Sequence, residues 1–261
     1  MPPPAGGPGS FDGSGADPFA ARIWRLGGGT LTLGPKGLIV GVLNVTPDSF
    51  SDGGVNLLPE KAAQSAAAMV ARGAAIIDIG AESTRPGAAP VGGDEERARL
   101  LPVLEAVHAR LPDVPISVDT YRADTARAAI GAGARIVNDV WGLQRDAGIA
   151  VLAAETGAGL IIMHTGRDRR VLADPVEDQR AFLSRSIAIA QAAGVRDDQI
   201  VLDPGFGFAK DPGHNAALMA RFAELHALGC PMLVGTSRKR FLGHFTGRET
   251  DARDVATAAT T

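Results

Sequence analysis

Side chains with amide, hydroxyl and carboxylate groups are concentrated directly after an apolar run near the start of the chain. The run covers residues 38–43, and Asn44 follows it. The loop after Asn44 contributes further oxygen groups, from Thr46, Asp48, Ser49, Ser51 and Asp52. Pro47 cannot continue a central strand, because it has no N–H to donate to a sheet. We therefore expect Asn44 at the end of a strand, where its uncharged oxygen is a suitable ligand for Mg²⁺.

Further residues of this kind stand at the ends of the later apolar runs. They are Asp78, the loop 82–87, Asp119, Thr120, Asn138, Asp139, Met163, His164, Asp203 and the segment 237–239. Any single polar member could cap a helix or make a turn, for which Asp, Asn, Ser and Thr are well suited. Their recurrence after every run is instead typical of an α/β barrel, which places its working groups at the carboxyl ends of its strands.

The mixture of groups favours a planar heterocycle and a phosphate as ligands. Asp119, Asn138 and Asp203 could together hydrogen-bond several donors and acceptors of one heterocyclic ring, since carboxylates accept and an amide does both. Arg85 and the Arg238–Lys239 pair are cations suited to phosphate. We find neither a Ser–His–Asp order with a nucleophile elbow nor a general base poised between two carboxylates.

The apolar runs alternate with longer, Ala-rich amphipathic stretches that predict helices. Seven runs are expected as strands, over 38–43, 75–79, 116–118, 135–137, 160–163, 200–202 and 232–234. The expected helices cover 59–72, 94–111, 122–131, 146–156, 176–193 and 215–228. This alternation favours a parallel sheet in a TIM (β/α)₈-type barrel. A Rossmann sheet would need Gly-x-Gly-x-x-Gly, and the nearest string, 205–210, lacks the third Gly.

The two ends of the chain depart from this pattern. Residues 1–21 are rich in Gly and Pro and are expected as a disordered tail, so that 22–261 form the barrel domain. A short β-hairpin that turns on glycines is predicted to precede the barrel. After the seventh run the sequence predicts two helices, over 238–245 and 251–261, and no eighth strand. We therefore expect seven β/α units and a truncated C-terminus.

Composition sets limits on the class of protein and its partners. The chain of 261 residues has 45% hydrophobic and 21% charged residues, which is typical of a globular domain. A net charge of −3 gives no electrostatic reason to expect nucleic acid or anionic lipid as a partner. Cys230 is the one cysteine, which excludes an internal disulfide and fits a reducing, cytoplasmic location. We find no membrane span or signal peptide in the sequence. His164, the one histidine at a strand end, is expected to be structural.

Six motifs taken together resemble bacterial dihydropteroate synthases. They are Asn-Val-Thr-Pro-Asp-Ser-Phe-Ser-Asp-Gly-Gly (44–54), Glu-Ser-Thr-Arg-Pro-Gly (82–87), Ser-Val-Asp-Thr (117–120), Val-Asn-Asp-Val (137–140), Leu-Asp-Pro-Gly-Phe-Gly-Phe-Ala-Lys (202–210) and Thr-Ser-Arg-Lys (236–239). They occur in the family's order from about residue 23 onward. The resemblance implies a pterin-binding TIM barrel of folate biosynthesis and a target of sulfonamides. Such an enzyme joins 6-hydroxymethyl-7,8-dihydropterin diphosphate to p-aminobenzoate and releases diphosphate.

The resemblance also assigns roles to individual residues. It implies that Asn44 contacts Mg²⁺ and diphosphate, and that Thr84 and Arg85 lie in a loop that closes over diphosphate and p-aminobenzoate. The implied pterin-binding and pocket residues are Asp119, Asn138, Met163, Asp203, Phe208 and Lys239. The catalytic group would comprise Asn44, Thr84, Arg85, Asp119 and Lys239. We expect small-molecule substrates rather than nucleic acid or a membrane as partners, and leave a homodimer open as the assembly.

The expected truncation keeps two other readings open. Family members continue through an eighth strand that ends in an Arg-x-His-Asp motif, which this sequence does not contain after residue 239. A non-catalytic pterin-binding homologue, with an intact pterin pocket and a lost grip on diphosphate, is therefore an alternative. A methyl-transferring pterin barrel of the corrinoid type shares the pterin-holding residues, but the loops 44–54 and 82–87 point away from it.

Overall fold

The computed structural model describes residues 20–45, 54–82 and 91–261. Its main sheet has six parallel strands in sequence order. The strands are β3 (Ile39–Asn44), β4 (Ala74–Gly80), β5 (Ile116–Asp119), β6 (Ile136–Asp139), β7 (Gly159–Met163) and β8 (Ile200–Asp203). Because each strand pairs with its neighbours in sequence order, all six carboxyl ends meet at one edge. The predicted disordered tail, apart from residues 20 and 21, lies outside the described residues.

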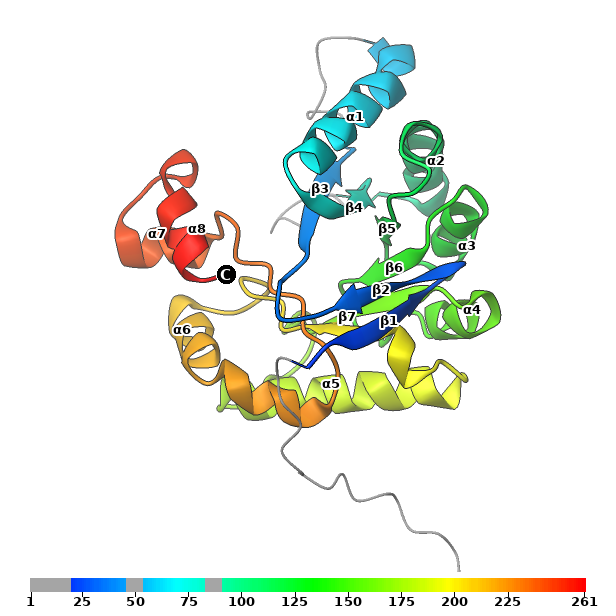
Figure 1. Cartoon of the computed structure of the whole chain (residues 1–261). Helices are drawn as coiled ribbons and strands as arrows, with labels where there is room; N and C mark the ends of the chain where they lie inside the picture. The colour runs from blue at the N-terminus through cyan, green and yellow to red at the C-terminus, as the bar shows by residue number, and fades with distance from the viewer. Residues whose placement is uncertain (1–19, 46–53, 83–90) are drawn as a thin grey trace, which may run out of the picture.

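Helices cover the outer face of this sheet (Figure 1). They are α1 (Gly54–Ala71), α2 (Gly93–Arg110), α3 (Ala123–Gly131), α4 (Gly148–Thr156) and α5 (Pro175–Ala192). After them come α6 (Pro212–Ala220), η3 (Phe222–Leu228), α7 (Arg240–Thr246), η4 (Thr250–Ala252) and α8 (Asp254–Ala259), of which α7 and α8 stand apart from the strands. The main apolar core lies between sheet and helices, where Ile77, Val118 and Val137 pack against Leu104 and Leu152. Strands and helices alternate as predicted, in a TIM-barrel-type arrangement. In the described part of the chain, no helix is both long and apolar enough to cross a membrane.

The seventh predicted strand, 232–234, was only partly right. Met232 forms one isolated parallel bridge with Leu202 of β8. The Leu202 N–H donates to the Pro231 carbonyl at 2.9 Å, and the Leu233 N–H donates to the Leu202 carbonyl at 2.8 Å. Pro231 has no N–H with which to extend the ladder. The segment therefore lies beside β8 without the length of a strand.

The N-terminal hairpin was predicted correctly and closes the amino-terminal end of the sheet. Strands β1 (Arg22–Leu26) and β2 (Gly29–Leu33) pair antiparallel. Trp24 and Leu26 pack on an apolar layer inside the sheet, formed by Ile76, Ile136, Ile161 and Val201. The Trp24 indole N–H donates to the Gln199 carbonyl at 2.8 Å, which fixes the hairpin under the strands.

The period of two along each strand separates the inner and outer faces of the sheet. Ile77 and Val137 join the outer core, whereas their neighbours Ile76 and Ile136 face the hairpin. The next inward positions, two residues further along the strands, are Asp78, Asn138, Met163 and Asp203. The interior is therefore apolar at its amino-terminal end and carries polar and charged groups toward its carboxyl-terminal end.

Candidate active site

Four strand-end residues lie in one row across the carboxyl edge of the sheet. Asn44 of β3 is in register with Gly80 of β4, Gly80 with Asp119 of β5, and Asp119 with Asn138 of β6. A Cβ added at Gly80 would lie 3.2 Å from the Cβ of Asp119, so glycine keeps space open between the side chains of Asn44 and Asp119. The sheet therefore brings together three residues that the sequence assigned to the site.

Asp78 and Asn138 are joined directly inside the sheet. The Asn138 Nδ2 group donates to Asp78 Oδ2 at 3.1 Å across the intervening strand β5. The Oδ1 atoms of both residues are buried and have no hydrogen-bond partner among the described residues. Buried polar atoms in folded proteins are nearly always paired, and an unpaired one costs about 1–3 kcal/mol. This pair is thus suited to an additional partner with N–H or O–H donors.

The carboxylates of the site have raised pKa values. Burial raises the pKa of Asp78 to about 6. Burial also raises the pKa of Asp119 well above its ordinary value, and the negative charges of Asp78, Asp139, Glu96 and Glu82 add to this. The pKa of Asp203 is raised by burial, although the Gly205 N–H and the two cations Lys239 and Lys210 oppose the shift. A ligand with several N–H donors would stabilise the ionised forms of these groups.

Lys239 and Phe208 lie against each other in the segments that follow β8 and residues 232–234. The Lys239 ammonium is 4.1 Å from the centre of the Phe208 ring. Burial lowers the pKa of Lys239, while the negative charges of Asp203 and Asp119 act in the opposite direction. Met163 is in register with Asp203 at the end of β7 and is buried. The structure therefore brings Asp119, Asp203, Phe208 and Lys239 into one electrostatic cluster.

Cations and aromatic rings alternate along the rim of the same edge. Arg145 lies over both Tyr121 and Trp141, 4.2 and 4.6 Å from the ring centres. Arg167 lies 5.9 Å from Trp141 and 5.0 Å from Phe208. Such cation–π contacts favour guanidinium groups held flat against rings. They connect the loops after β5, β6, β7 and β8 into a continuous rim that ends at Lys239.

Thr84 and Arg85, two predicted site residues, lie outside the described residues, but the chain on both sides of their segment is held by one side chain. Arg122 donates from Nη1 to Glu82 at 2.9 Å and from Nη2 to the Val91 carbonyl at 2.6 Å. Nη1 also donates to the buried Glu96 carboxylate at 2.8 Å. Glu82 and Val91, which flank residues 83–90 in the sequence, are therefore tied to the same guanidinium.

Asn44 is the predicted Mg²⁺ ligand, and its surroundings fit a loosely held ion. Its side chain is exposed at the end of β3. Within the described ranges, no three His, Cys, Asp or Glu side chains come together in a group that could hold a metal ion. Mg²⁺ often takes only one or two protein oxygen ligands and fills its remaining positions with water and substrate phosphate. An exposed carboxamide at the end of a strand can serve as one such ligand.

His164 is buried and structural in its contacts, as expected from the sequence. Its Nε2 atom is 2.9 Å from Asp178 of α5, and its ring packs against Phe182. Burial lowers the pKa of the imidazole to about 4. Arg169 donates to Asp178 from Nη1 at 2.9 Å and completes an ion-paired cluster beneath the site.

The sequence drew attention to Asp78 without giving it a specific role; it interrupts the apolar run 75–79, and a charged residue inside an otherwise apolar strand is a signal for function. Two further residues of the site were not selected from the sequence. Lys210 was noted only as part of a motif, and its contacts depend on the shape of a turn. Arg167 belongs to a polar loop whose sequence carries no specific signal.

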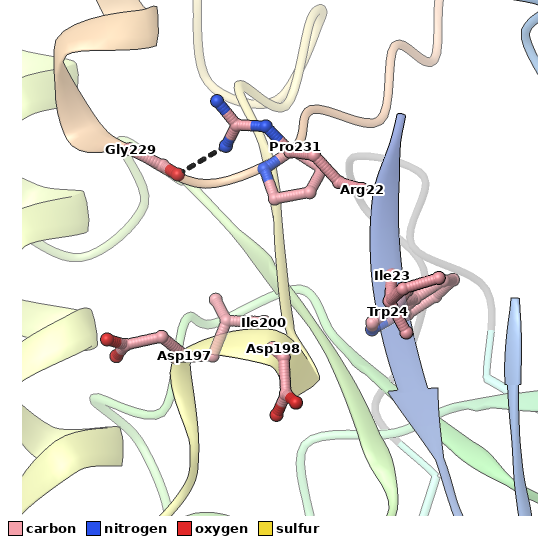
Figure 2. Close-up of a pocket in the computed structure, with 8 residues that line it drawn as sticks. All are labelled: Arg22, Ile23, Trp24, Asp197, Asp198, Ile200, Gly229 and Pro231. Atoms are coloured by element: carbon pink, nitrogen blue, oxygen red, sulfur yellow. Dashed lines mark hydrogen bonds between the residues drawn. The ribbon is translucent and has the colours of Figure 1, made fainter. Parts of the chain in front are cut away.

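The opposite end of the molecule holds a cavity of a different kind (Figure 2). It has a volume of about 190 Å³ and is lined by Arg22, Ile23, Trp24, Asp197, Asp198, Ile200, Gly229 and Pro231. Arg22 donates to the Gly229 carbonyl at 2.5 Å, and Asp198 pairs with Arg25 and Arg196. Because Arg22 and Asp198 already have partners in the protein, the cavity offers few groups to a ligand.

Comparison with known proteins identifies a consistent set of relatives. The family model described as pterin binding enzyme matches residues 40–261. The dihydropteroate synthase of Bacillus subtilis (strain 168) is 47% identical over 225 residues, which cover 86% of this chain and 78% of that protein.

Solved structures agree with this match. A Xanthomonas albilineans dihydropteroate synthase with 4-aminobenzoic acid superposes with a TM-score of 0.84 at 39% identity, covering 91% of this chain and 87% of that one. The dihydropteroate synthase of the same organism in complex with 7,8-dihydropteroate gives a TM-score of 0.80 at 36% identity, covering 90% and 87%.

Proposed function

The chain belongs to the pterin-binding enzyme family, and we propose that it is a dihydropteroate synthase. As a transferase it condenses 6-hydroxymethyl-7,8-dihydropterin diphosphate with p-aminobenzoate to 7,8-dihydropteroate and diphosphate. Beyond the relatives, the observation that carries this function is the cluster of buried carboxyl and amide groups at the carboxyl edge of the sheet. Their raised pKa values and unpaired oxygen atoms suit a heterocycle rich in N–H donors.

The described residues divide into a pterin face and a rim. Asp119, Asn138 and Asp203 hold the edge of the pterin ring by hydrogen bonds, and Lys239 supplies a donor from the opposite side. Met163 and Phe208 line the pocket with apolar surface. A site of this kind discriminates strongly against ligands that lack the matching donors, because its own buried groups would then be left unpaired.

The chemistry follows from charge. The bond between the pterin methylene carbon and the diphosphate oxygen breaks, and positive charge develops on the methylene carbon and the ring. The carboxylates of Asp119 and Asp203 are held in place to stabilise that charge. The aromatic amine of p-aminobenzoate then forms the C–N bond and loses a proton. Since this amine is weakly basic and already nucleophilic, no strong general base is needed, in keeping with the structural contacts of His164.

Mg²⁺ and the segment 83–90 enter as further parts of the proposal. Asn44 would hold Mg²⁺, which when bound would neutralise charge on the departing diphosphate. Thr84 and Arg85 would contact diphosphate and p-aminobenzoate. Arg85→Ala should lower turnover and leave pterin affinity nearly intact, because its charge is needed where diphosphate leaves. A collapse of pterin binding in this variant would instead place Arg85 in the pterin pocket.

A diphosphate-release assay tests the function. Release should require both substrates and should rise with added Mg²⁺. No finding favours the non-catalytic pterin-binding alternative, which predicts pterin binding in calorimetric titration without any diphosphate release. A homodimer and a cytoplasmic location stay predictions of the sequence. Light scattering coupled to size-exclusion chromatography checks the assembly, and cell fractionation checks the location.

A further inference from the structure

The turn after β8 carries Phe208 and is shaped by backbone conformations that few residues adopt. Gly205 has φ +62° and Gly207 has φ +79°. A Cβ at Gly205 would lie 2.2 Å from the His164 carbonyl oxygen, and one at Gly207 would lie 3.3 Å from Cδ of Lys239. Glycine therefore allows this turn to lie directly against β7 and against the Lys239 stem.

Side chains, rather than a sheet, satisfy the backbone groups of this turn. Asp203 Oδ1 accepts from the Gly205 N–H at 2.7 Å, and Asn215 Oδ1 accepts from the Gly207 N–H at 2.7 Å. The carbonyl groups are bound by Lys210, whose Nζ donates to Gly205 at 2.8 Å and to Phe208 at 3.3 Å. Lys210 is the cation that ties the two ends of the turn together from within.

The surroundings of Lys210 come from four parts of the fold. Asp203 of β8 and Asp178 of α5 attract its charge, whereas Arg169 after β7 and Lys239 oppose it. Burial lowers the pKa of the Lys210 ammonium to about 7. No chemistry of the condensation uses this group, because its donors are directed to the two carbonyls.

We propose that Lys210 is a positioning residue, which holds the 205–208 turn so that Phe208 lies over Lys239 and Asp203 faces the pterin. This inference rests on the proposed function and adds a residue to it. The Phe208 N–H also donates to the Gly205 carbonyl at 3.0 Å and keeps the turn closed. Without the two Lys210 bonds, however, the Phe208 carbonyl loses its partner, and the ring is held less firmly against the Lys239 ammonium. Pterin affinity should therefore fall, while p-aminobenzoate and diphosphate contacts elsewhere on the edge stay in place.

The main test replaces Lys210 by Met, which keeps the length of the stem and removes the donors. Calorimetric titration with 6-hydroxymethyl-7,8-dihydropterin should show at least tenfold weaker binding for K210M. The KM for p-aminobenzoate should stay within about twofold of wild type, and cooperative thermal unfolding should be kept. The matched control is K36M, at an exposed lysine outside the sheet, which should bind the pterin as wild type does.

The conservative variant K210R and the pH profile supply an independent test. Arg keeps its charge at all accessible pH values and can donate to both carbonyls. Wild-type affinity should fall in part as pH rises through about 7, because the neutral amine keeps two N–H donors but loses the charge that strengthens its hydrogen bonds. K210R should keep its affinity over the same range. Lys239 is present in both proteins, so its titration cannot produce the difference. If K210M does not fold, this comparison decides the proposal.

The outcomes separate this inference from the proposed function. A wild-type protein that does not bind the pterin would overturn the function itself. Wild-type binding together with unchanged binding in K210M, or identical pH profiles for wild type and K210R, would overturn only the role of Lys210. If K210M weakened pterin binding and raised the KM for p-aminobenzoate by the same factor, the substitution would have damaged the fold in general, and the specific role of Lys210 in the turn would be overturned.

Discussion

The two ends of the sheet differ in whether their buried polar groups have hydrogen-bond partners. At the amino-terminal end, Gln199 donates to the Ala153 and Ala158 carbonyls at 3.1 and 2.7 Å, and its Oε1 accepts from the Arg196 N–H at 3.0 Å. Of the five buried side-chain polar atoms without a partner in the described part of the chain, four lie toward the carboxyl-terminal end, on Asp78, Asn138, His164 and Gln179. The fifth, Ser117 Oγ, lies between the two ends, in register with Asp78 on one side and Ile136 on the other.

We infer from this difference that the amino-terminal end of the barrel mainly contributes to stability, whereas the carboxyl-terminal end keeps polar groups available to a ligand. A fully paired, apolar end contributes to the free energy of folding, whereas unpaired and like-charged groups lower it. Groups of the second kind persist where a ligand supplies their partners. Substitutions at the two ends should therefore affect different measured quantities.

The largest effect is expected at the amino-terminal end, from Trp24→Ala. The indole is 3% exposed and packs on the inner apolar layer, so its removal should lower the free energy of unfolding by about 3–5 kcal/mol. Urea denaturation measures this loss. Pterin affinity of the protein that remains folded should be unchanged in calorimetric titration. Lost affinity with retained stability would show that the two ends are coupled.

Asp119→Asn and Asp203→Asn should instead weaken pterin binding without lowering stability. Each replaces a buried acceptor with a group that cannot accept the same donors, which should weaken pterin binding by about 1–3 kcal/mol. The melting temperature should stay the same or rise, because each substitution removes a buried, disfavoured charge. Calorimetric titration and thermal unfolding on the same samples check both parts. Near-unchanged pterin affinity in either variant would refute that residue's role.

A smaller effect is expected from Asp78→Asn, with Asp139→Asn as its matched control. Both carboxyl groups are buried in neighbouring parts of the sheet, and burial raises the pKa of each to about 6. Asp78 bonds Asn138 inside the barrel, whereas Asp139 accepts from the Trp141 and Leu143 N–H groups outside it. Asp78→Asn should weaken pterin binding by about 0.5–1.5 kcal/mol through loss of the fixed Asn138 amide. Asp139→Asn should lower the melting temperature without changing pterin affinity.

The last effect concerns pH and is confined to a narrow pH range. A carboxyl group whose pKa is raised by folding stabilises the protein while it is protonated, and this stability is lost as pH rises from the ordinary value to the raised one. For Asp78 this window runs from 3.8 to about 6. The free energy of unfolding should fall across this window and should fall less in Asp78→Asn, by up to about 3 kcal/mol, since one pKa unit corresponds to about 1.4 kcal/mol. Urea denaturation at several pH values, without ligand, provides the measurement. Identical slopes for the two proteins would show that Asp78 does not titrate there.

Much of the framework could be predicted from the sequence because its signals are local. The hairpin follows from glycines between two short apolar runs, and the strands follow from apolar runs between amphipathic stretches. Asp119, Asn138 and Asp203 could be placed at strand ends because each directly follows such a run. The segment 232–234 carries the same local signal, but Pro231 and a single neighbouring strand limit it to one bridge.

Relations between distant segments could not be read from local pattern. Asn138 and Asp139 are adjacent and both polar, and only the register of β6 decides that the first lies inside the barrel and the second outside. The bond between Asp78 and Asn138 joins residues on strands that are not neighbours. The role of Lys210 depends on a turn with three positive φ values, at Gly205, Gly207 and Ala209, which the sequence alone does not specify.

The position of Arg122 has a consequence for how this protein can change over evolutionary time. One guanidinium binds Glu82 before the segment 83–90 and the Val91 carbonyl after it. Substitutions between Glu82 and Val91 do not change the hydrogen bonds of Arg122 to these two residues. Selection can therefore act on such substitutions through their effect on ligands alone. A substitution of Arg122 would remove these hydrogen bonds and would therefore alter the effect of every substitution between Glu82 and Val91. We expect the residues between Glu82 and Val91 to vary and Arg122 to be retained.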